Sequence, residues 1–176
     1  HLVKNNKFLL DEVASLLTDN NYPVRNLEQN LADLKAQIAA NKKGIHELKA
    51  MIEQFGLATV AAYTKHIQDN AELAVREVIS KLKNGNFTYA MDNGCKIQLS
   101  VTIDNKNKSA TVDFTGTSKQ KNNNFNAPKA VCRAAVLYVF RTLVKENIPL
   151  NEGCLKPITI IIPDDCLLNP RYPAAV

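Results

Sequence analysis

An unbroken heptad pattern runs through the first half of the chain. From Leu27 to Phe55, residues recur at alternating spacings of four and three, all apolar except Asn41. This spacing predicts one long amphipathic helix. Asn26 is a suitable N-cap for it, and Gly56 is a suitable C-terminal stop.

A second pattern with helical spacing follows directly. Its members are Val60, Thr64, Ile67, Ala71, Ala74, Val78 and Leu82, and it ends before Asn84-Gly85. Because only a turn at Gly56 separates the two patterns, they predict a long antiparallel α-helical hairpin whose apolar seams pack together.

Beyond Gly85 the apolar period changes to two, which is typical of half-buried strands. Ile97–Ile103 and Ala110–Phe114 alternate in this way on either side of a polar turn, and so predict a β-hairpin. Phe87–Met91 and the β-branched run Ile158–Ile162 predict two further strands.

Another helix is predicted before the last of these strands. Asn126 can cap its start, Pro128 fits its first turn, and the helix would continue to about Lys145. Because Ala130–Phe140 is apolar on nearly all sides, we expect this helix to be buried. A short helix, Leu9–Leu17, is expected near the N-terminus.

Together these elements predict an α+β fold. It consists of a long antiparallel helical hairpin, followed by a small, mainly antiparallel β-sheet packed on a buried helix. We expect an N-terminal segment over residues 1–25, the hairpin over 26–84 and the α+β portion over 85–176.

Composition and charge limit the kinds of partner that we expect this chain to bind. The 176 residues are 45% hydrophobic and 22% charged, as in an ordinary globular chain. The net charge of +5 comes mainly from loop lysines, namely Lys106, Lys108, Lys119, Lys121 and Lys129. Nucleic-acid sites more often cluster arginines with aromatic residues, so we expect no nucleic-acid partner. The longest apolar run, Ala134–Phe140, is far shorter than the ~20 residues that span a bilayer, so we expect no membrane partner.

The four cysteines, at positions 95, 132, 154 and 166, show no zinc-site spacing. Cys132 lies in an apolar helical run, where a buried free thiol is usual. The N-terminus lacks the apolar core of a signal peptide. These features predict reduced thiols and a cytoplasmic protein.

Most standard active-site motifs are absent. The chain has no GxxxxGK phosphate loop, no GxGxxG and no GxSxG. His46-Glu47 begins like HExxH, but Ala50 stands where the second histidine is needed. With histidines only at positions 1, 46 and 66, we predict no metal site and no cofactor bound by this chain alone.

Three polar loops remain as candidate sites, and the first is Thr115–Ser118. Its glycine can adopt a positive φ, and its backbone N–H groups could form an anion nest. Thr117 is therefore a candidate catalytic residue, and Gly116 and Ser118 are candidate cofactor-binding residues. The alternative is a plain turn or bulge.

The other two loops each carry one charged candidate. Glu152, in Asn151–Gly153, could act as an acid, a base or a ligand. Arg171, in Asn169–Pro173, is held next to prolines and could pair with a carboxylate or a phosphate. Structural turns are again the alternative. If the loops are functional, we expect all three to lie near one another at one end of the sheet.

Five segments, taken in order, resemble the hydantoinase B/oxoprolinase family from about Asn26 onward. They are DLKAQIAA (33–40), VDFTGTS (112–118), NAP (126–128), IPLNEGCLKP (148–157) and LLNPRYPAAV (167–176). Each segment is short, but their shared order and spacing make the resemblance specific.

The resemblance implies that the chain is a fragment of the B subunit or domain of an ATP-dependent hydrolase. Enzymes of this kind open cyclic amides such as 5-oxoproline or a hydantoin, and related members of the family carboxylate ketones. It also implies a hydantoinase A-type partner, and ATP and a divalent metal for the complete enzyme. Residues 85–176 would belong to a larger catalytic domain, truncated at its C-terminal end. The family's metal motifs would precede His1, so we expect the fragment alone to be inactive. The alternative function is a stand-alone coiled-coil-type interaction module that docks through the hairpin.

Overall fold

The computed structural model describes all residues from 1 to 176. They form two compact units, His1–Ala61 and Ala62–Val176. None of the helices combines the length and the apolar character needed to cross a membrane.

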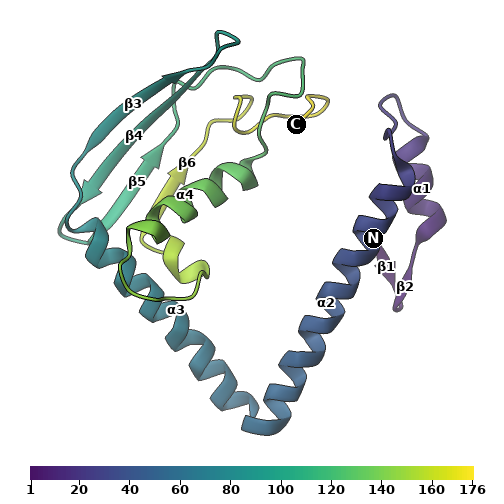
Figure 1. Ribbon diagram of the computed structural model, residues 1–176, viewed down its shortest axis with the longest axis horizontal. Coiled ribbons are helices and arrows are strands. Elements are labelled where there is room, and N and C mark those ends of the chain that lie inside the picture. The colour runs from purple at the N-terminus through teal and green to yellow at the C-terminus, as the bar shows by residue number, and fades with distance from the viewer. The chain divides into compact units, whose positions relative to one another are not determined.

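The first unit is mostly helical (Figure 1). Two short antiparallel strands, β1 (Val3–Lys4) and β2 (Lys7–Phe8), precede α1 (Leu10–Thr18), which packs beside the long helix α2 (Leu27–Phe55). The Asn26 side chain accepts a hydrogen bond from the Gln29 N–H (3.1 Å), so the predicted N-cap is confirmed. The two strands were not predicted, because two residues are too few to show a period.

Gly56 ends α2 as predicted, with φ at +81°, and α3 (Leu57–Ile79) begins directly after it. The prediction that the whole second apolar pattern packs against α2 is wrong for the later part of α3. There Ala71 is buried in the core of the second unit, and Ala74, Val78 and, just beyond the helix, Leu82 pack against that core. No residue of α2 is buried. The antiparallel packing of the two helices stays a prediction.

The second unit contains a four-stranded sheet in the order β3-β4-β5-β6. The strands are β3 (Gly85–Ala90), β4 (Lys96–Asp104), β5 (Ser109–Asp113) and β6 (Ile158–Ile161). The first three pair antiparallel and β6 pairs parallel to β5. The predicted α+β class, with a mainly antiparallel sheet, is therefore confirmed.

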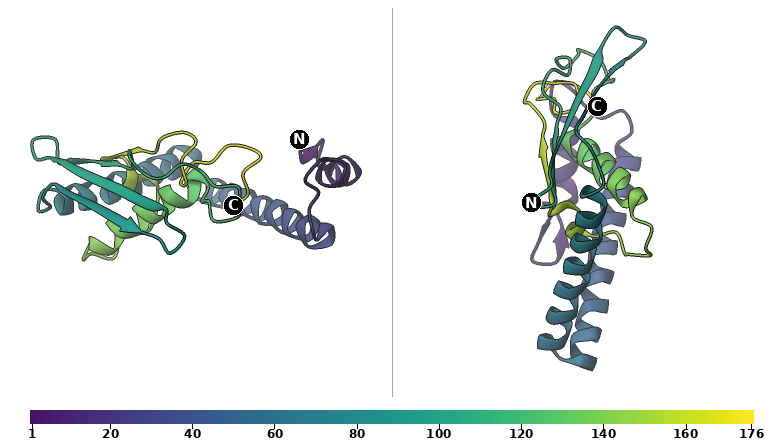
Figure 2. Two further views of the ribbon diagram at one scale, coloured as in Figure 1. Left: turned by 90° about the horizontal axis from the view of Figure 1, so that it is seen from above. Right: turned by 90° about the vertical axis from the view of Figure 1, so that its left-hand side faces the viewer.

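The two faces of this sheet differ in polarity. Val101 lies opposite Val112, and Val112 lies opposite Ile160, so these apolar residues share one face. Helix α4 (Lys129–Leu143) contributes the buried residues Cys132, Val136 and Phe140 to the same core. Figure 2 shows this unit from two further sides.

The expectation that α4 is buried holds for one side of the helix only. Val131, Tyr138, Val139 and Leu143 are exposed, although all are apolar or aromatic. The sheet and α3 cover one flank of the helix and leave the other open. Composition alone does not reveal this, because it cannot say how many flanks have a partner. The helix also ends at Leu143, earlier than expected.

Candidate functional site

The parallel strands β5 and β6 finish at the same end of the sheet, and the loops that follow them lie together there. The Phe114 N–H donates to the Ile161 carbonyl (2.9 Å), and the Leu167 N–H donates to the Ser118 carbonyl (2.9 Å). We call residues 114–127 and 162–176 the loop end of the sheet. Two of the three candidate loops, Thr115–Ser118 and the one that holds Arg171, belong to it.

The hydroxyls of Thr117 and Ser118 hold the backbone of β4. Thr117 Oγ1 accepts from the Gln98 N–H (3.1 Å) and donates to the Gln98 carbonyl (3.2 Å). Ser118 Oγ accepts from the Lys96 N–H (2.9 Å). These two side chains therefore extend the pairing of β4 beyond the end of β5.

Gly116 allows this loop to turn tightly over β4. Its φ is +95°, as its place in the loop suggested, and a Cβ placed on it would stand 2.5 Å from Gln98 Oε1. The anion-nest interpretation is weakened by the neighbouring N–H groups. Those of Thr115, Thr117 and Ser118 already donate to Asp113 Oδ1, the Phe114 carbonyl and the Lys96 carbonyl. An anion would have to displace these bonds.

Arg171 pairs with carboxylates of its own loop, one of the two partner types predicted for it. Its Nη2 lies 2.9 Å from Asp164 Oδ2, and its Nε lies 3.1 Å from Asp165 Oδ1. The Arg171 N–H donates to Gln120 Oε1 (2.7 Å), which ties the loop to residues 118–121. The side chain is 63% exposed, so its guanidinium is accessible to a ligand.

Asn126 is the buried polar residue of the loop end, with 7% of its surface exposed. Its Oδ1 accepts from the Lys121 N–H (2.8 Å), and its Nδ2 lies within 2.9 Å of the carbonyls of Lys121, Asn123 and Ala175. The prediction that Asn126 caps α4 is wrong, because Pro128 occupies the N-cap position. The side chain instead joins two loops distant in sequence, which local patterns do not reveal.

Asn151–Gly153 lies elsewhere, so the expectation that all three loops gather at one end is wrong. This loop opens the 3₁₀ helix η1 (Glu152–Leu155), which precedes the start of β6, whereas the loop end follows its finish. Asn151 Oδ1 accepts from the Gly153 N–H (2.8 Å), and Glu152 is exposed. A Cβ on Gly153 would overlap the carbonyl oxygen of Gln68, so η1 packs directly on α3.

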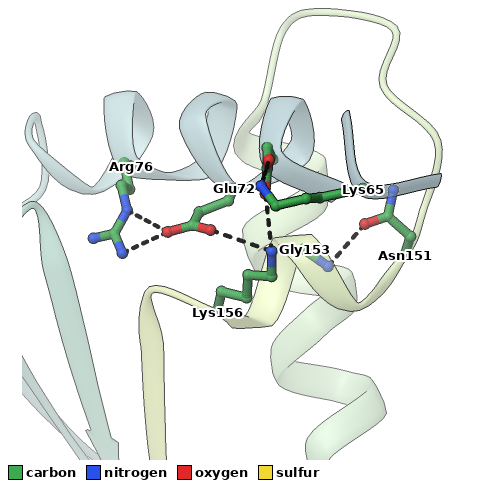
Figure 3. Close-up of polar contacts among 7 residues, drawn as sticks. Lys65, Glu72, Arg76, Asn151, Gly153 and Lys156 are labelled. Atoms are coloured by element: carbon green, nitrogen blue, oxygen red, sulfur yellow. Dashed lines mark hydrogen bonds and ion pairs between the residues drawn. The ribbon is translucent and has the colours of Figure 1, made fainter. Parts of the chain in front are cut away.

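An ion-pair network fixes η1 to α3 (Figure 3). Lys156 Nζ lies 3.2 Å from Asp69 Oδ1 and 3.5 Å from Glu72 Oε2, and Glu72 also pairs with Arg76 (2.7 Å). Hydrogen bonds from Lys65, and then from Lys156, lower the pKa of Asp69. Every charge of this network has a partner on the protein, which indicates a structural role.

The four cysteines are all buried and free, as predicted for reduced thiols. Burial raises the pKa of the Cys132 thiol to about 11, with a smaller contribution from Cys166. No group of three or more His, Cys, Asp or Glu side chains could hold a metal ion. The loop end contains no histidine. It offers hydrogen-bond donors, acceptors and one exposed guanidinium.

Comparison with known proteins shows the family. The sequence model described as Hydantoinase B/oxoprolinase matches residues 1–176, and the chain therefore belongs to the hydantoinase B/oxoprolinase family.

Individual relatives are considerably longer. The chain is 47% identical over 168 residues to 5-oxoprolinase 1 of Arabidopsis thaliana and 45% identical over 161 residues to 5-oxoprolinase of Dictyostelium discoideum. Each match covers 86% of this chain and 13% of the relative. The crystal structure of the ATP-dependent caprolactamase from Pseudomonas jessenii shares the fold. Its TM-score is 0.68 at 21% identity, over 98% of this chain and 30% of that one.

Proposed function

We propose that this chain is a part of the B component of an ATP-dependent hydrolase that opens cyclic amides, with 5-oxoproline or a hydantoin as substrate. The observation that carries the proposal is the family match over all 176 residues. Two relatives at 45% and 47% identity are named 5-oxoprolinase, which favours 5-oxoproline.

Within such an enzyme this chain supplies scaffold and binding loops. Coupling amide hydrolysis to ATP needs a bound nucleotide, a metal and a positioned nucleophile or base. The chain has no phosphate-loop motif, and no group of its side chains fits a metal ion, so we assign it no metal ligand. We infer that a hydantoinase A-type partner and other parts of the protein provide these functions, and that the chain alone is inactive. We also infer that the enzyme acts in the cytoplasm.

Arg171 and Thr117 are the candidate residues that this proposal keeps together. Both lie at the loop end. There the exposed guanidinium of Arg171 would exchange its ion pairs with Asp164 and Asp165 for an anionic group such as the carboxylate of 5-oxoproline. Thr117 acts as a positioning residue through its two bonds to β4. Glu152, at the other end of β6, is outside this cluster.

The proposal is tested with the intact protein and its A-type partner. We expect ATP hydrolysis that depends on an added cyclic amide, with product formed in proportion to the ATP consumed. The 176-residue chain alone should show no turnover, and ATP should not shift its unfolding temperature, because a ligand stabilises only a state that binds it. An intact protein that binds a partner but opens no cyclic amide would favour the interaction module instead.

A further inference from the structure

Strand β3 is a sheet edge without the usual protection. All six of its residues are exposed, and they pair one to one with residues 96–101 of β4, so no bulge interrupts the edge. The strand, Gly85–Ala90, contains no charged residue and no proline. Native proteins normally block an exposed edge with such features, because its free N–H and C=O groups pair readily with another strand. The opposite edge, β6, has four residues and is followed by Pro163.

An apolar groove lies beside this edge. Phe87 is opposite Leu99 on the core face, but α3 and α4 do not cover it, and 64% of its surface is exposed. The groove has a volume of about 460 Å³ between this part of the sheet and the open flank of α4, where Val139 and Leu143 are exposed. An open edge and an open apolar groove thus meet along β3, which is the outermost strand of the sheet in Figure 1.

We propose that an extended segment of the same polypeptide, from outside residues 1–176, pairs with β3 as a fifth strand and places apolar side chains in this groove. This inference rests on one part of the proposed function, namely that the chain is part of a longer protein. Its length supports that occupant, because the chain spans 13% of its 5-oxoprolinase relatives and 30% of the caprolactamase chain. Strand addition uses the free main-chain groups for affinity and the groove for alternate side chains.

Residue-resolved hydrogen exchange tests the added strand. In an antiparallel pair, only every second residue of β3 directs its N–H toward β4, and the others point outward. In the 176-residue chain we expect the outward amides to exchange rapidly. In the intact protein we expect all amides of β3 to be protected. Outward amides that exchange equally fast in both proteins would overturn the proposal.

A pair of variants tests whether the groove is filled. Phe87→Lys places a charge on the groove side of β3, whereas Thr88→Lys places the same charge on its polar face and serves as the control. In the intact protein, Phe87→Lys should raise the exchange rate of the outward amides by at least about tenfold, and Thr88→Lys should not. Equal effects of the two variants would contradict a filled groove.

The occupant is identified by dilution. A segment of the same polypeptide protects β3 at every protein concentration, whereas protection that disappears as an oligomer dissociates would assign the groove to a second copy and overturn the proposal. Exchange is measured without substrate. A protein that opens no cyclic amide but protects β3 would therefore refute the proposed function and leave this inference standing.

Discussion

Replacing Gly153 by alanine tests the direct packing of η1 on α3. Gly153 is buried, and a Cβ placed on it would overlap the Gln68 carbonyl oxygen and stand 2.8 Å from the carbonyl carbon. Real Cβ atoms essentially never approach other atoms more closely than 3.0 Å. Because the obstacle is backbone and not a flexible side chain, η1 and α3 must move apart.

The cost follows from two contributions. Overpacking a close contact costs roughly 1–3 kcal/mol. The separation also weakens the pairs of Lys156 with Asp69 and Glu72, which as solvent-screened ion pairs add little to this cost. We expect Gly153→Ala to lower the free energy of unfolding by about 3 kcal/mol. In a chain of this size, that corresponds to a fall of about 6–12 °C in the midpoint of thermal unfolding.

Urea and thermal unfolding, followed by far-ultraviolet circular dichroism, measure this loss. Gly85→Ala is the matched control, because a Cβ there meets nothing within 4 Å and the position does not need a positive φ. We expect the control to change stability by no more than about 0.5 kcal/mol. If the two variants are equally stable, η1 does not pack on α3 as described.

Three further predictions concern activity, loop structure and pH. In the intact enzyme, Arg171→Ala should lower turnover about tenfold or more, a loss of about 1.4 kcal/mol of transition-state stabilisation. Glu152→Ala should leave turnover unchanged. Steady-state kinetics that show equal losses for the two variants would refute the role assigned to Arg171. Asn126→Ala should destabilise the chain by about 2–3 kcal/mol in urea, because it removes the four hydrogen bonds of a buried amide that joins two loops. The exposed Asn122→Ala should have little effect. Finally, the free energy of unfolding should fall as the pH rises from about 9 to about 11, since the unfolded chain releases the Cys132 proton in this range while the folded chain retains it. Cys132→Ala should remove that part of the pH dependence in equilibrium unfolding measured across this range.

The longer helices and strands of this fold can be predicted from the sequence, because each has a local periodic pattern. The alternation at Ile97–Ile103 corresponds to β4, and the heptad spacing from Leu27 corresponds to α2. The Asn26 cap also depends only on a neighbour three residues away. Such features arise from contacts within one element or one turn, so the local sequence is sufficient to predict them.

Candidate site residues were harder to interpret, because their partners are distant along the chain. The residue types of Thr117 and Arg171 suggested binding, but their actual partners are Gln98 in one case and Asp164 and Asp165 in the other. Asn126 appeared to be a local helix cap, yet its side chain reaches Ala175, 49 residues away. No pattern around these residues encodes those contacts.

The amino-acid pattern alone thus determines which longer segments are helices and strands, which face of most of them is apolar, and the order of segments by which the family is recognised. The packing of the second unit decides where those faces go: the later part of α3 covers the sheet, α4 keeps one flank open, and Glu152 lies at the opposite end of β6 from Arg171. The physical reason is that burial of apolar surface is non-directional. Periodicity shows which face of an element is apolar and therefore favours burial, but the element that covers this face depends on how all the elements pack into one core.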